Sequence, residues 1–111
     1  MRIEIRGRNV EVTDELREHV TKRFARVGRQ VSELATLEVE LSAERNPSIA
    51  DSQIAEATLH LKGVTLRARE ASADLMHSVD LCADKLARQV KRHREKRRNR
   101  RGRVEAADAT T

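Results

Sequence analysis

Residue types that often build functional sites are scarce in this sequence. Cys82 is the only cysteine, which excludes an internal disulfide and leaves too few ligands for a cysteine-based zinc site. Trp and Tyr are absent, and Phe24 is the only phenylalanine. Single-stranded nucleic acids are usually held by stacking of their bases on aromatic side chains. The sequence therefore argues against that mode of binding.

Long apolar runs are also absent. No segment approaches the roughly 20 apolar residues that a membrane-spanning helix needs. The first residues, MRIEIRGRN, alternate apolar with charged side chains and do not resemble a signal peptide. We therefore expect a soluble, cytoplasmic protein.

Positive charge is concentrated in one segment near the C-terminus. The net charge is +5, yet residues 1–87 carry −2 and residues 104–111 carry −2. Residues 88–103 carry +9, from ten lysines and arginines against one acid, Glu95. The body of the chain is thus nearly neutral, and one short segment supplies almost all of the basic character.

The length predicts one domain. A chain of 111 residues suits a single modest core and leaves little room for an enclosed substrate cavity. We expect residues 1–100 to form this domain. Residues 101–111 are expected to be a basic, flexible tail or the start of a linker, and residues 104–111 have the composition of a disordered end.

Two segments have the apolar spacing of amphipathic helices. Thr13 is suited to cap the first helix, and Gly28 is expected to mark its end. Ser72 is expected to cap the second helix, with Asp74 in its first turn. A helix from Ser72 to about Arg98 would be on the order of 39 Å long, well beyond a small sheet. The two apolar stripes are Leu16, Val20, Phe24 and Val27 in the first helix, and Leu75, Val79, Cys82, Leu86 and Val90 in the second.

Four segments alternate apolar and polar residues with the period of a strand. They are RIEIR (2–6), LEVELSAE (37–44), QIAEATLHLKG (53–63) and VTLRAR (64–69). The only proline lies in the segment RNPSIAD, which we interpret as a turn. The order β-α-β-β-β-α predicts a two-layer α+β fold, with a four-stranded mixed sheet and both helices packed on one face. The first two strands should be parallel, and the rest should form an antiparallel meander.

Lysines and arginines follow two helical rows that are expected to face away from the core. At about 100° of rotation per residue, the row of the second helix is Lys85, Arg88 and Arg92. The row of the first helix is Lys22, Arg26 and Arg29. If the helices lie side by side, the two rows form one basic surface. The candidate RNA-binding residues are these six, Lys22, Arg26, Arg29, Lys85, Arg88 and Arg92, together with Lys91 and Arg94 of the same basic segment.

A folded RNA is the partner that this charge pattern favours. A solvated basic tail is the simpler interpretation of a charge run, but ten basic residues in sixteen exceed what solubility requires. A phosphate backbone suits them, because each neutralised phosphate releases condensed counterions. The open face of the predicted sheet carries acids that would repel phosphate, namely Glu38, Glu40, Glu44 and Glu56. Binding is therefore expected on the helical side and should depend on shape and backbone more than on base sequence.

Three parts of the sequence resemble a known family. They are GRNVEVTDELREHV (7–20), the strands LEVELSAE and AEATLHLKG with LRARE, and above all DLMHSVDLCADKLARQVKRH (74–93). Over residues 1–100 the sequence resembles the N-terminal domain of the ribosome hibernation-promoting factors, or ribosome-associated inhibitors, also called sigma-54 modulation proteins. The resemblance implies the same β-α-β-β-β-α fold.

The resemblance also implies an inhibitor of translation that is not an enzyme and needs no cofactor, metal or small-molecule substrate. Members of this family bind the small ribosomal subunit, contact 16S rRNA through both helices, and compete with mRNA and tRNA in stationary phase or stress. Carried over by position, the rRNA contacts would be Lys22, Arg26, Lys85, Arg88, Lys91 and Arg92. Long members add a C-terminal domain that pairs ribosomes, and VEAADATT (104–111) resembles the start of the linker to it. Met76 departs from the family, which commonly has an aromatic residue there.

Two other classes of function stay open at this point. An enzyme could use His77, Asp80 and Cys82, but Cys82 falls in the buried stripe and the histidines show no ligand spacing or nucleophile pairing. A protein-interaction module, such as a modulator of transcription, could place its basic tail on an acidic partner. Residues 75–86 could then form a short coiled-coil seam. An anionic membrane is disfavoured, because the tail has no apolar face to insert.

Overall fold

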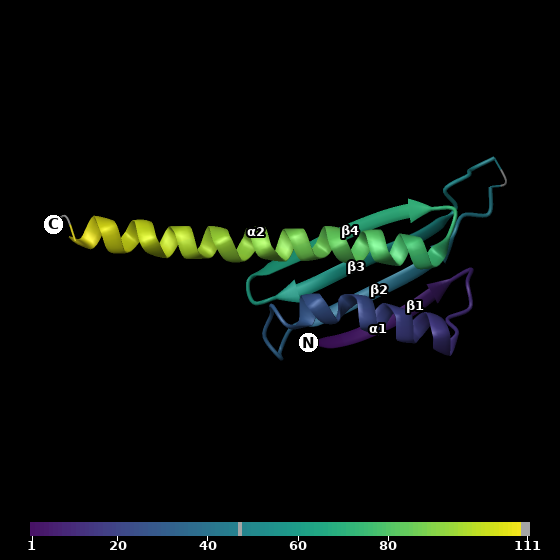
Figure 1. Cartoon of the computed structure of the whole chain (residues 1–111), viewed down its shortest axis with the longest axis horizontal. Coiled ribbons are helices and arrows are strands. Elements are labelled where there is room, and N and C mark those ends of the chain that lie inside the picture. The colour runs from purple at the N-terminus through teal and green to yellow at the C-terminus, as the bar shows by residue number, and fades with distance from the viewer. Residues whose placement is uncertain (47, 110–111) are drawn as a thin grey trace.

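The structure is a computed structural model that describes residues 1–46 and 48–109, with side chains as far as Arg98. Its elements follow the order that the sequence predicts (Figure 1). They are β1 (Arg2–Arg8), α1 (Asp14–Gly28), β2 (Thr36–Ala43), β3 (Gln53–Leu61), β4 (Val64–Ser72) and α2 (Leu75–Ala109). Pro47, which belongs to the predicted turn, lies outside the described residues.

The four strands form one mixed sheet in the order β1-β2-β3-β4. β1 pairs with β2 in parallel, and Ile3 and Ile5 lie beside Leu37 and Val39. The β2–β3 and β3–β4 pairs are antiparallel. Parallel neighbours cannot be joined by a tight turn, so the chain crosses over the sheet between them, and α1 is this crossover. The predicted α+β topology is therefore confirmed.

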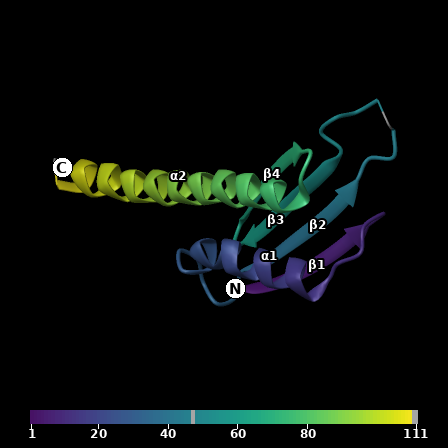
Figure 2. The same cartoon turned by 45° about the vertical axis from the view of Figure 1, so that its right-hand side comes forward.

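Both helices cover the same face of the sheet. α2 packs on β3 and β4 and contacts α1, which lies along β1 and β2 (Figures 1 and 2). The two helices thus lie side by side on the face that the sequence predicts both of them to cover. Their outer surfaces together form the side of the molecule opposite the open face of the sheet.

The core lies between this helical layer and the sheet. Thr13 caps α1, because its hydroxyl oxygen accepts a hydrogen bond from the Leu16 amide at 3.1 Å. The predicted stripe of α1 is buried throughout, and Phe24 is the largest fully buried side chain. In α2 the stripe is fully buried from Val79 to Val90, whereas Leu75 is only partly buried. The sheet contributes Leu37, Val39, Leu41, Ala55, Ala57, Leu59 and Ala68.

The start of α2 differs from the prediction. Ser72 is the last residue of β4, and the helix begins at Leu75. The Asp74 carboxylate accepts a hydrogen bond from the Met76 amide at 3.3 Å, so Asp74 and not Ser72 caps the helix. The Ser72 hydroxyl lies 2.6 Å from the hydroxyl of Ser78 and stabilises the same corner from outside the helix.

The far end of α2 also differs from the prediction, because the helix continues to Ala109 instead of ending near Arg98. It projects well past the edge of the sheet, and the molecule measures 64 × 29 × 18 Å as a result (Figure 1). Lys, Arg and Glu are good helix formers, and the docked turns supply a nucleus from which the helix propagates. The division at residue 100 into a domain and a tail or linker stays a prediction.

Candidate nucleic-acid interface

Two shallow hollows lie between α1 and α2 on the outer side of the helical layer. The first, of about 400 Å³, is lined by His19, Lys22, Arg23, Arg26 and Asp84. The second, of about 410 Å³, is lined by Arg26, Gln30, Asp84, Ala87, Arg88 and Lys91. They share Arg26 and Asp84, and we call the two together the interhelical groove. Its side chains come from both helices, so the groove exists only when α1 and α2 are docked side by side.

Half of the predicted RNA-binding residues line this groove. They are Lys22 and Arg26 from α1, and Arg88 and Lys91 from α2. All four side chains belong to exposed residues. Arginine and lysine side chains at such positions can reach phosphate oxygens while their stems rest on the helices. The groove is therefore the strongest candidate for the RNA interface.

The other predicted residues lie outside the groove. Lys85 points the opposite way, toward β4, where its ammonium lies 3.5 Å from a Glu70 carboxylate oxygen. Arg92 lines a separate hollow of about 400 Å³ on that same side, with Val64, Leu66, Gln89, His93 and Lys96. Arg29 is exposed at the C-cap of α1, and Arg94 is exposed on the part of α2 that follows the buried stripe.

The predicted single basic surface is thus only partly correct. Lys85, Arg88 and Arg92 do not present one row toward α1, because Lys85 and Arg92 lie on the flank of α2 that faces β4. The rotation of α2 on the sheet decides which flank meets α1, and that rotation is set by packing. The role of each residue in binding RNA stays a prediction.

The sequence analysis did not foresee the contact between the helices, which acids of α2 make with bases of α1. One Asp80 carboxylate oxygen lies 2.8 Å from Nε2 of His19 and forms an ion pair with Arg23, whose Nε is also 2.8 Å away. An Asp84 carboxylate oxygen accepts a hydrogen bond from Arg26 at 2.7 Å. The sequence does contain a signal for this contact, which is the matching spacing of acids on one helix and bases on the other. Acids four residues apart on one helix match bases at intervals of four and three on the other.

The open face of the sheet carries charges of both signs, which corrects the expectation of an acidic surface. A Glu40 carboxylate oxygen lies 3.8 Å from a guanidinium nitrogen of Arg6. A Glu56 carboxylate oxygen lies at the same distance from Nε of Arg69. Glu38 lies 3.3 Å from His60. A hollow of about 390 Å³ on this face is lined by Arg8, Asn9, Glu40, Ser42, Ala43, Glu44, Arg45, Ile54, Glu56 and Arg69. The prediction that RNA binds on the helical side therefore loses the argument from repulsion and depends on the cations of the groove.

The residues considered for catalysis lie in three different environments. The Asp80 carboxylate is hydrogen-bonded to His19 of α1, His77 is exposed, and Cys82 is buried in the core. Val79, Cys82 and Leu86 are covered by the sheet, so they do not form a coiled-coil seam. Within the described part of the chain, no group of three or more metal-ligating side chains comes together. None of the described helices is long and apolar enough to cross a membrane.

Folded protein is expected to protect Cys82 from thiol reagents. Burial raises the pKa of this thiol to about 12, and the Cys82 sulfur donates a hydrogen bond to the Ala68 carbonyl at 3.4 Å. Only the thiolate reacts, so at pH 8 labelling by a chromogenic disulfide should be about a thousandfold slower in the folded than in the unfolded chain. The unfolded thiol ionises near pH 9, so stability should fall as the pH rises above that value.

Labelling rates with and without denaturant test the protection of Cys82, and a Cys82→Ala variant gives the background. Rapid labelling of the folded protein at neutral pH would contradict the buried assignment and reopen a reactive role for this thiol.

Comparison with known proteins gives a consistent set of similarities. The family model described as "Sigma 54 modulation protein / S30EA ribosomal protein" matches residues 3–98. A "Ribosome hibernation promoting factor" from Salmonella typhimurium is 38% identical over 96 residues, which cover 86% of this chain and 96% of that protein. A "Ribosome hibernation promotion factor" from Picosynechococcus is 35% identical over 97 residues, and the match covers 86% of this chain but only 50% of that protein's length.

A solved structure shows the same fold. It is the crystal structure of the Thermus thermophilus Protein Y N-terminal domain, with a TM-score of 0.72 and 35% sequence identity. The match covers 84% of this chain and 99% of that domain. The similarity thus extends over the sheet, both helices and the docked part of α2.

Proposed function

Because the chain belongs to the Sigma 54 modulation protein / S30EA ribosomal protein family, we propose that it is a ribosome hibernation factor. It binds the small ribosomal subunit, contacts 16S rRNA, occupies the channel used by mRNA and tRNA, and so inhibits translation. This mechanism is occlusion: it involves no chemical step and requires no cofactor. The site of action is the cytoplasm, where ribosomes are found.

The observation that carries the proposal is the interhelical groove with its four exposed cations. Lys22 and Arg26 face it from α1, and Arg88 and Lys91 face it from α2. Along α2 the exposed cations continue through Arg92 and Arg94 to Arg98. Cations held on packed helices lose less conformational freedom on binding than cations on a mobile tail. The arrangement thus favours a folded polyanion of matching shape.

The shape of the molecule supports binding inside a channel. The molecule measures only 18 Å along its shortest axis, and α2, which projects past the sheet in Figure 1, extends the longest axis to 64 Å. An aromatic stacking platform is missing, so contacts to phosphate and ribose oxygens must supply the affinity. The groove cations are the contacts that we assign to rRNA, with Arg92 and Arg94 beyond them and Arg29 and Lys85 at the periphery.

Affinity for small subunits should fall steeply with salt. If about four phosphates are neutralised, raising monovalent salt from about 50 to 200 mM should weaken binding roughly 10²-fold. Cosedimentation with purified small subunits at constant Mg²⁺ measures this dependence. Binding that does not change with salt would contradict a phosphate interface.

The same assay locates the binding site. Subunits that already carry mRNA and a P-site tRNA should no longer bind the protein, whereas empty subunits should. Undiminished binding to loaded subunits would exclude the channel but leave ribosome binding intact. Failure of the folded protein to bind empty subunits at low salt would overturn the proposed function.

A further inference from the structure

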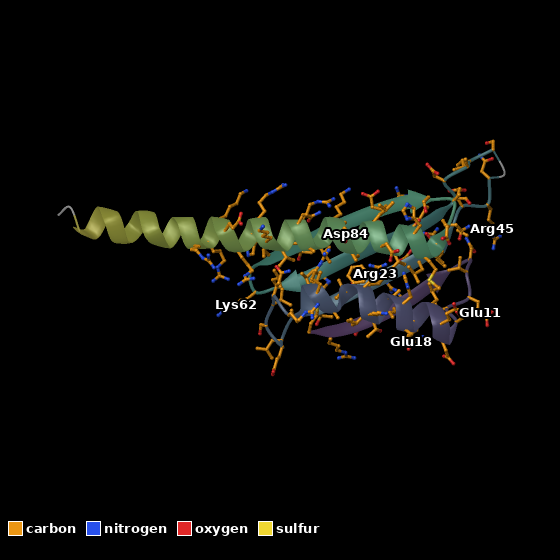
Figure 3. All side chains as sticks on the ribbon, viewed as in Figure 1. Glu11, Glu18, Arg23, Arg45, Lys62 and Asp84 are labelled. Carbon is orange, nitrogen blue, oxygen red and sulfur yellow. The ribbon has the colours of Figure 1, made fainter. Side chains whose placement is uncertain are left out.

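The contacts between α1 and α2 have a consistent polarity. In each side-chain contact between acids and bases of these helices that the structure describes, α2 supplies the acid and α1 supplies the base. Asp80 holds His19 and Arg23, and Asp84 holds Arg26. Figure 3 shows Arg23 and Asp84 in the band where the two helices face each other. The orientation of the α1 arginines thus depends on carboxylates of α2.

Asp84 is an acidic residue among the cations of the interhelical groove, where its negative charge weakens the attraction of polyanions. It lines both hollows of the interhelical groove, between Lys22 and Arg26 on one side and Arg88 and Lys91 on the other. Its side chain is 54% exposed, so its negative charge can repel an incoming phosphate. An exposed ion pair contributes little to folding stability. Stability alone therefore does not account for an acid at this position.

We propose that Asp84 is a positioning residue that makes the groove selective for its folded RNA over other polyanions. The inference rests on the proposed function and adds the basis of its selectivity. One amino group of the Arg26 guanidinium donates a hydrogen bond to an Asp84 carboxylate oxygen at 2.7 Å. A guanidinium has five N–H donors in a fixed plane, so the donors that Asp84 does not engage stay available to a phosphate in the groove that Arg26 lines. Asp80 also pairs with an arginine of α1, since its carboxylate oxygen lies 2.8 Å from Nε of Arg23.

Two effects of the carboxylate then act in the same direction. Fixing Arg26 lowers the entropy lost when it binds a phosphate at the matching position. The negative charge in the groove weakens attraction to polyanions whose phosphates do not match it. RNA of the correct shape gains from the first effect and tolerates the second, whereas an arbitrary polyanion meets only the second. Asp84 therefore raises the affinity for the correctly shaped RNA relative to the affinity for other polyanions.

The variant Asp84→Asn separates selectivity from affinity. It keeps the size of the side chain and removes its charge and its ion pair. We expect binding to poly(U) to strengthen about threefold and binding to small subunits to weaken about threefold, since exposed ion pairs have effects of this size. The discrimination ratio, which is the affinity for small subunits divided by the affinity for poly(U), should thus fall about tenfold. Unchanged thermal unfolding would show that the change does not come from partial unfolding.

Glu70→Gln is the matched control for the change of charge. Glu70 pairs with Lys85 at 3.5 Å on the other flank of α2, outside the interhelical groove. This variant makes the same change in net charge and should strengthen binding to both partners alike. An equal loss of discrimination in Glu70→Gln and Asp84→Asn would show that net charge alone is responsible and would overturn the proposal.

A double-mutant cycle with Arg26→Ala tests whether Asp84 acts through Arg26. In the Arg26→Ala background, Asp84→Asn should weaken small-subunit binding no further. An undiminished effect in that background would contradict positioning. If the wild-type chain binds small subunits and Asp84→Asn leaves its discrimination unchanged, the inference alone fails. If the wild-type chain does not bind them, the proposed function fails and the inference fails with it.

Discussion

Replacing Arg88 and Lys91 by glutamate should lower the affinity for small ribosomal subunits by at least about 10²-fold. Both residues line the interhelical groove, and both are exposed, so folding should be preserved. A hydrogen bond to a charged group contributes about 1.5–3 kcal/mol, and the double variant loses two such contacts to phosphate. The introduced carboxylates add repulsion. Cosedimentation at fixed salt measures the affinity, and a cell-free translation assay measures the loss of inhibition.

Arg8→Glu/Arg67→Glu is the control with the same change in net charge. Arg8 and Arg67 are exposed residues of β1 and β4. Neither takes part in an ion pair among the residues whose side chains are described. We expect this variant to bind within about threefold of the wild type, since only long-range attraction is reduced. Equal losses in both variants would mean that total charge governs binding, and normal binding of Arg88→Glu/Lys91→Glu would exclude the groove.

Lys85 is a poorer target for such an experiment than its sequence position suggests. A glutamate there would face Glu70, which lies 3.5 Å from the Lys85 ammonium, and could lower stability by repulsion. A loss of binding in that variant would then have two explanations. The structure therefore makes Arg88 and Lys91, which line the groove, better targets than Lys85 and Arg92, which lie on the other flank of α2.

The fold was accessible from the sequence because burial follows the period of each element. The stripe Leu16, Val20, Phe24 and Val27 predicts both the existence of α1 and the face that it buries. The strands alternate with a period of two, and most of their inward residues belong to the core. Local patterns sufficed here, since a two-layer fold leaves each element one face to bury.

The arrangement of the candidate site was less accessible because it depends on how one helix is rotated against another. Asp84 and Lys85 are neighbours in the sequence, and about 100° of rotation separates them on the helix. Packing on β3 and β4 turns Asp84 toward α1 and Lys85 toward Glu70. The basic rows were recognisable from spacing, but the acids between them became visible only when both helices were placed.

The end of α2 shows a second limit of local reasoning. After Val90 no apolar residue marks a buried face until Val104, so periodicity gives no information on where the helix stops. Helix propensity and propagation from the docked turns decide that instead, and the helix continues to Ala109.

Phe24→Ala should cause the largest loss of stability of the single substitutions considered, about 3–5 kcal/mol. Phe24 is fully buried and is the largest such side chain. Truncation would leave a cavity between α1 and the sheet, and domains have only about 5–15 kcal/mol of stability in total. Denaturant unfolding measures the loss, and Phe24→Leu, which retains most of the volume, should lose only about 1–2 kcal/mol. A loss below about 1 kcal/mol for Phe24→Ala would contradict its place in the core.

This core substitution and the charge reversal should separate folding from recognition. Phe24 anchors the helix that carries Lys22 and Arg26, yet it does not itself line the interhelical groove. At temperatures where Phe24→Ala is still folded, we expect its affinity for small subunits to stay within about threefold of the wild type, because the groove cations remain in place. On warming, its binding should disappear together with its folded fraction, whereas Arg88→Glu/Lys91→Glu should be defective at every temperature. Loss of binding by folded Phe24→Ala would mean that the depth at which α1 docks sets the geometry of the groove.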